Sequence, residues 1–100
     1  MERKEIHINP TKIKNNIDMK TQKIFKYLQK HEIYADIYED NNQICILIEW
    51  GDWKHDHAYL NYLMNNIGYN CINEELLESD GSDCYSAVHH FKKVKNVHFH

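Results

Sequence analysis

Two stretches of this sequence carry histidines at spacings that suit metal binding. Imidazole nitrogens and carboxylate oxygens are ligands for Zn²⁺ and similar ions. The first stretch offers two imidazoles and two carboxylates within six residues, and the second is a histidine pair: His55, His57, Asp52 and Asp56, then His89 and His90. On a strand, residues two apart face the same side, whereas on a helix they lie about 200° apart. Whether His55 and His57 act together therefore depends on the element that carries them.

The residues after Asp52 predict a helix, which separates these two histidines. Asp52 suits the N-cap, and Gly68 suits a left-handed C-terminus. Side chains suited to a buried stripe recur between them at spacings of four and three: Trp53, His57, Leu60, Met64 and Ile67. On this helix His57 faces the core, and His55 faces solvent beside Asp56. We therefore expect a structural His57 with no bound metal or cofactor. A metal- or ligand-binding set of His55, His57, His89 and His90 is the first alternative.

The sequence pattern places no nucleophile beside a general base. Cys84 and His90 share one face of an expected strand, but six residues at ~3.3 Å each put them about 20 Å apart. The five carboxylates between Glu74 and Asp83 surround a turn, which is typical of a solvated surface. We therefore predict no catalytic residues and a non-enzymatic protein.

Length and composition predict one small globular domain. The chain has 100 residues, of which 42% are hydrophobic and 27% charged.

The three cysteines are widely spaced, which favours reduced thiols over a disulfide framework or a structural zinc site: Cys45, Cys71 and Cys84. The polar start Met1–Asn9 lacks the apolar stretch of a signal peptide, and no run approaches the ~18 apolar residues of a membrane span. These features predict a cytoplasmic protein.

Charge is sorted along the chain. Residues 1–31 carry eight Lys/Arg and three Asp/Glu, residues 32–83 carry one Lys and twelve Asp/Glu, and residues 84–100 carry three Lys and no acid. The net charge of -3 therefore combines segments of +5, -11 and +3. Sorted charge governs attraction between whole partners rather than the fold. It favours a protein that binds a partner of opposite charge.

The basic segment contains the clearest predicted helix. Asn9 suits its N-cap and Pro10 its first position. Apolar residues then recur at helical spacing, and four lysines fall within about 60° of one another on the other side: Ile13, Ile17, Ile24 and Leu28, then Lys12, Lys23, Lys26 and Lys30. Such a lysine face can track phosphates, so nucleic-acid binding is the second alternative. The acidic total charge and the single arginine, Arg3, oppose it.

Alternating patterns predict strands at residues 33–38 and 84–93. A continuous apolar run predicts a central strand at 43–50, and a further extended stretch spans 69–78. We predict an α+β fold of two helix-strand-strand units, forming a four-stranded antiparallel sheet with both helices on one face. The first unit spans residues 10–50 and the second spans 51–93, between an extension (1–9) and a tail (94–100). The expected core residues are Ile13, Ile17, Ile24, Leu28, Ile44, Ile46, Ile48, Leu60, Met64 and Ile67.

Most acids of the middle segment belong to the two expected hairpins, where tyrosines stand among them. The expected partner-binding residues are Asp36, Glu39, Asp40, Glu74, Glu75, Glu78, Asp80 and Asp83, with Tyr34, Tyr38 and Tyr69. Aromatic residues amid acids suit a surface that meets a basic site on a larger protein. We therefore predict an inhibitor, immunity protein or nucleic-acid mimic, of the kind encoded by phages or mobile elements. A merely solubilising acidic face is the plain alternative, and the edge strands leave room for a homodimer.

Overall fold

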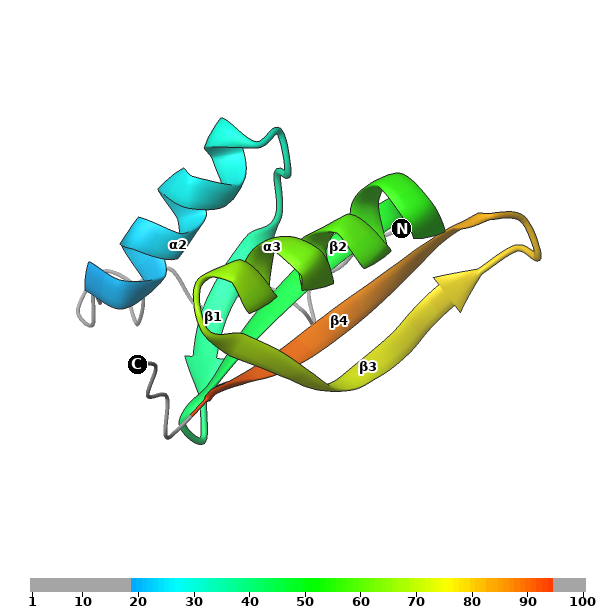
Figure 1. Cartoon of the computed structure of the whole chain (residues 1–100). Helices are drawn as coiled ribbons and strands as arrows, with labels where there is room; N and C mark the ends of the chain where they lie inside the picture. The colour runs from blue at the N-terminus through cyan, green and yellow to red at the C-terminus, as the bar shows by residue number, and fades with distance from the viewer. Residues whose placement is uncertain (1–18, 95–100) are drawn as a thin grey trace.

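A four-stranded antiparallel sheet forms the centre of the structure (Figure 1). The computed structural model describes residues 19–94, and the strand order is β1-β2-β4-β3. The strands are β1 (Asp36–Asp40), β2 (Gln43–Asp52), β3 (Tyr69–Ser79) and β4 (Cys84–Lys93), and the helical elements are α2 (Met19–Lys30), η2 (Trp53–Ala58) and α3 (Tyr59–Asn66). The α+β class and the antiparallel sheet are as predicted. Within the described range, no helix combines the length and the apolar character that crossing a membrane requires.

Helix α2 ends in a Schellman motif that has a glutamate where glycine is usual. The Ile33 N–H donates to the Leu28 carbonyl at 2.9 Å. The Glu32 N–H donates to the Gln29 carbonyl, also at 2.9 Å, and Glu32 has a φ of 64°. Because Ile33 and Leu28 are both buried, they supply the apolar contact of the motif. Ile33 therefore belongs to the helix end, and β1 begins at Asp36 rather than at Ile33, where the alternation placed it.

Strands β1 and β2 form a hairpin with a two-residue turn. Asp40 pairs with Gln43, and the turn residues Asn41 and Asn42 have φ values of 51° and 65°. Two consecutive left-handed residues define a type I′ turn, whose twist matches that of the flanking strands and which favours asparagine. The hairpin expected from the strands at residues 33–38 and 43–50 is therefore present, and its two asparagines set the register of β1 against β2.

Strand β2 lies between β1 and β4, and successive residues on both of its faces are buried. Ile44, Ile46 and Ile48 pack with apolar residues of α2, α3 and β4, whereas Cys45 and Leu47 form a second cluster with Val88. Seven of the expected core residues are buried and Ile67 is partly buried, while two lie outside the described residues: Ile24, Leu28, Ile44, Ile46, Ile48, Leu60 and Met64, then Ile13 and Ile17. The residues expected to begin the first helix, Asn9 and Pro10, also lie outside them.

The second predicted helix begins with a π-helical turn, η2. Its predicted cap is present, since the Asp52 carboxylate accepts hydrogen bonds from the N–H groups of Lys54 (3.0 Å) and His55 (2.8 Å). Gly68 has a φ of 89° after the end of α3, as expected for its left-handed position. The i→i+5 bonds of a π-helix do not keep the 100° spacing on which the buried stripe was drawn. Trp53 was expected in that stripe and is instead 50% exposed, which corrects the prediction.

Candidate functional site

The backbone between β2 and α3 is irregular, and it sets His57 against β4. Strand β2 has a register shift between Ile48 and Gly51. Within it Trp50 has a φ of 48°, and its N–H donates to Ser86 Oγ at 2.8 Å. Bulges, left-handed non-glycine residues and π-turns recur beside functional side chains. The groups around His57 are therefore the first candidates for a functional site.

His57 and His89 form a buried pair, with 2% and 0% of their surfaces exposed. His57 Nδ1 lies 2.8 Å from His89 Nε2. On the outer sides of the pair, His57 Nε2 lies 2.9 Å from the Tyr85 carbonyl oxygen, and His89 Nδ1 lies 3.0 Å from Asn61 Oδ1. Burial lowers the pKa of His89 to about 4, which favours its uncharged ring at neutral pH.

Glu74 completes this group from β3. It is the direct cross-strand neighbour of His89, and its Oε2 lies 3.9 Å from His89 Nε2. The Tyr85 hydroxyl donates a hydrogen bond of 3.0 Å to the same oxygen. Burial, and then this hydrogen bond, raises the pKa of Tyr85 to about 12, so the hydroxyl stays protonated. Three residues each offer one ligand atom, and these atoms lie within 4.8 Å of one another: His57, Glu74 and His89. These residues are the candidate metal ligands among residues 19–94.

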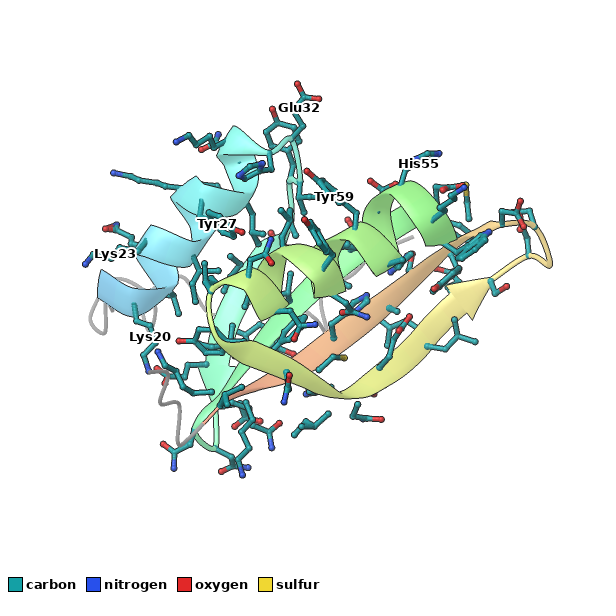
Figure 2. All side chains as sticks on the ribbon, in the orientation of Figure 1. Lys20, Lys23, Tyr27, Glu32, His55 and Tyr59 are labelled. Carbon is teal, nitrogen blue, oxygen red and sulfur yellow. The ribbon has the colours of Figure 1, made fainter. Side chains whose placement is uncertain are left out.

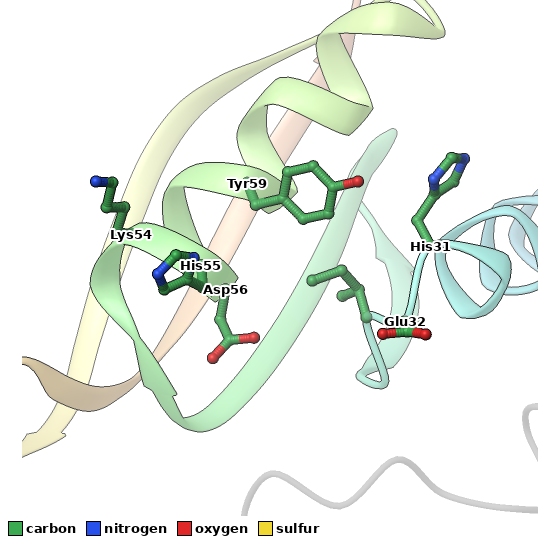
Figure 3. Close-up of a pocket in the computed structure, with 7 residues that line it drawn as sticks. His31, Glu32, Lys54, His55, Asp56 and Tyr59 are labelled. Atoms are coloured by element: carbon green, nitrogen blue, oxygen red, sulfur yellow. The ribbon is translucent and has the colours of Figure 1, made fainter.

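The structure divides the four histidines that the sequence singled out. His57 and His89 meet, whereas His90, as the next residue of a strand, faces the other side of the sheet. His55 is exposed and lines an open depression of about 480 Å³ between the end of α2 and η2, as Figure 3 shows. Its position apart from His57 agrees with the helical prediction. Glu74 had been assigned only to the partner-binding surface, because nothing local in the sequence indicates its pairing with His89.

A second polar row on the other face of the sheet was not predicted. Cys45 Sγ lies 3.4 Å from His90 Nδ1, and His90 Nε2 lies 3.2 Å from Glu75 Oε1. The order resembles a nucleophile-base-acid triad. Cys45 is only 1% exposed, however, and burial, reinforced by the charge of Asp40, raises its pKa to about 11. The thiol is therefore neither accessible nor ionised at neutral pH, which opposes nucleophilic chemistry.

Comparison with known proteins assigns no function to either row. No protein-family model, curated protein or solved structure matches this chain.

The expected partner-binding acids are all exposed, but they divide between the two edges of the sheet. Three lie on β1, and five lie on β3 or in the turn after it: Asp36, Glu39 and Asp40, then Glu74, Glu75, Glu78, Asp80 and Asp83. Strands β2 and β4 separate these edges. Of the expected tyrosines, Tyr34 is exposed and Tyr38 packs against the Cys45 cluster. Tyr69 is 6% exposed and packs in the main core, so it does not belong to the surface.

Strand β3 is a long exposed edge. Nine of its eleven residues are exposed, and within residues 19–94 it pairs only with β4. Ile72, Leu76 and Leu77 are 50%, 61% and 40% exposed. Trp50 and Trp53 are also exposed near the turn that follows β3, where the Trp53 N–H donates to the Asp83 carbonyl. Long edge strands with apolar side chains are templates for other chains.

The lysine face of α2 is present in the part of the helix that the structure describes. Lys23, Lys26 and Lys30 are exposed, and Figure 2 shows Lys23 pointing away from the sheet. Lys20 Nζ forms an ion pair with Glu39 Oε2 at 3.4 Å. Lys12, the remaining member of the predicted face, lies outside the described residues.

Proposed function

We propose that this protein is a non-enzymatic binding module that docks a basic region of a larger protein on β3 and the turn after it. The main support for this proposal is the exposed edge strand, on which three large apolar side chains stand among carboxylates. We further propose that both helices lie on one face of the sheet, so that the edge formed by β3 stays accessible. A module of this kind suits an inhibitor, immunity protein or nucleic-acid mimic.

Charge argues for a basic partner rather than a second copy of this chain. Two copies paired through β3 would bring the carboxylates of each strand close to those of the other, which destabilises a ladder. A basic partner gains from the same carboxylates, mainly in association rate. Trp50 and Trp53 beside the turn supply aromatic groups of the type that dominates binding energy in protein interfaces.

Two matched triple variants test this proposal. The tagged full chain would first retrieve its partner from a nuclease-treated lysate of the source cells, and the purified partner would then be titrated. E75Q/E78Q/D83N neutralises the β3 side, and D36N/E39Q/D40N removes the same charge from β1. We expect the β3 triple to slow association ~10-fold, because steering charges act on the on-rate, and the β1 triple to change it less than about twofold.

The outcomes separate the explanations. An equal fall in association rate for both triple variants would mean that net charge, not the β3 surface, attracts the partner. Recovery of nucleic acid alone before nuclease treatment, with no protein afterwards, would overturn the proposal and point to the lysines of α2.

A further inference from the structure

We propose that His57, His89 and Glu74 bind one divalent transition-metal ion of the Zn²⁺ class, coordinated through His57 Nδ1, His89 Nε2 and Glu74 Oε2. The site lies between η2, β4 and β3. Glu74 belongs to the same strand as the docking surface proposed above, but neither proposal rests on the other. Two imidazoles and one carboxylate are a donor set that Zn²⁺ accepts, with a fourth position left for water.

The hydrogen bonds at the far ends of the two rings argue for a cation between them. The Tyr85 carbonyl can only accept, so His57 Nε2 carries its proton there. Asn61 Oδ1 also accepts, so His89 Nδ1 carries its proton there. With those protons placed, His57 Nδ1 and His89 Nε2 face each other across 2.8 Å and are the two ring nitrogens available to bind one ion. A metal ion between the two nitrogens accepts both lone pairs, whereas a proton shared by the rings or a rotated Asn61 amide is the arrangement without a metal.

Each proposed ligand also has an orienting partner, as metal ligands usually do. The Tyr85 carbonyl fixes His57, and Asn61 Oδ1 fixes His89, in the tautomers that aim the facing nitrogens at the ion. The Tyr85 hydroxyl holds the Glu74 carboxylate at 3.0 Å. Tyr85 thus supports two of the three ligands, one through its backbone and one through its side chain.

The spacing of the ligand atoms fits a tetrahedral ion after a small movement. Zn–N distances of ~2.0–2.1 Å place two ligand nitrogens about 3.3 Å apart. The observed distances, 2.8 Å between the facing nitrogens and 3.9 Å between His89 Nε2 and Glu74 Oε2, lie on either side of that value. The Glu74 side chain is 34% exposed, whereas that of His89 is fully buried. The fourth position would therefore face solvent on the Glu74 side.

Adjacent residues on opposite faces of the sheet provide matched controls. The full chain, stripped with a chelator, would be titrated with Zn²⁺ in competition with a chromophoric chelator and with Co²⁺ as a visible-absorption probe. We expect one ion per chain. Glu74→Gln should weaken Zn²⁺ binding at least ~10-fold, while Glu75→Gln stays within about twofold of the original protein. His89→Gln should abolish the Co²⁺ spectrum, and His90→Gln should retain it.

Several results would overturn the metal site. If the original protein binds no ion, the metal site is wrong, and a proton between the rings or an Asn61 amide that donates its NH₂ to His89 Nδ1 completes the chain of hydrogen bonds instead. If Glu74→Gln and Glu75→Gln bind alike, or if folded His89→Gln keeps the Co²⁺ spectrum, the ion binds elsewhere. Should His89→Gln fail to fold, the two glutamate variants decide the question, because both side chains are partly exposed.

Discussion

Neighbouring residues on β3 and β4 have different surroundings because successive side chains of a strand point to opposite faces. Glu74 and His89 lie with His57 on one face, and Glu75 and His90 lie on the other. Each face therefore has a histidine and a carboxylate in contact. His89 is fully buried and meets a second imidazole, whereas the His90 side chain is 19% exposed and meets a thiol. The two sites therefore differ in burial and in their third residue. That residue is His57 in the candidate metal site and Cys45 in the polar row on the other face.

Cys45 should be the least reactive of the three thiols. Alkylation requires the thiolate, and burial together with Asp40 raises the Cys45 pKa to about 11. Its thiolate fraction is thus very small at neutral pH and grows only as the pH approaches 11. Alkylation with iodoacetamide, followed by mass spectrometry between neutral pH and about pH 10, should label Cys84 before Cys45.

The contrary result has a definite meaning. Fast labelling of Cys45 at neutral pH, abolished by His90→Gln, would show that the thiol is accessible and activated by His90. The Cys45-His90-Glu75 row would then be a candidate catalytic triad, contrary to our interpretation.

At the scale of elements, Gly51 allows the end of β2 to pack against η2. A Cβ at this position would lie 2.5 Å from Ile48 Cγ2 and 2.9 Å from Asp56 Cβ. The same junction is held by a 2.7 Å hydrogen bond from the Asp52 N–H to Asp56 Oδ2. Because the clash involves an atom next to the backbone, flexible side-chain ends cannot relieve it. The close approach at Gly51 thus fixes the segment that carries His57.

Gly51→Ala should therefore destabilise the fold by ~1–3 kcal/mol, the usual cost of overpacking. The free energy of unfolding in urea measures this loss. Gly81→Ala is the control, because its Cβ would meet nothing within 4 Å and only its φ of 90° is unfavourable, at about 1 kcal/mol. A smaller loss at Gly51 than at Gly81 would contradict the packing argument.

Local periodicity accounts for the elements that the sequence predicted, and non-local pairing accounts for what it did not. The apolar run of β2 and the Asp52 cap depend on neighbouring residues, so both could be predicted. The contact between His57 and His89 joins positions 32 apart and depends on which strands become neighbours. Glu74 joins them only through the β3-β4 register, which contains two shifts. Trp53 was misplaced because a π-turn leaves no distinctive residue pattern.

At the scale of the whole molecule, the two edges of the sheet are protected differently. Strand β1 is five residues long, and its outer residues are charged. Strand β3 is eleven residues long and exposes leucines and an isoleucine. Natural edge strands commonly avoid pairing with one another through charge. In the proposed binding module the carboxylates of β3 would therefore have two consistent effects, since they would attract a basic partner and keep copies of this chain apart.

Neutralising those carboxylates should consequently promote self-association. The E75Q/E78Q/D83N variant keeps the exposed apolar edge but loses like-charge repulsion across a paired interface. Sedimentation velocity should show a concentration-dependent dimer for this variant and a monomer for the matched β1 triple D36N/E39Q/D40N. Adding Leu76→Lys should restore the monomer, because an inserted lysine blocks edge pairing. If the β3 triple stays monomeric at every concentration, its edge is protected by shape rather than by charge, and only the attraction of a basic partner remains as a role for the acids.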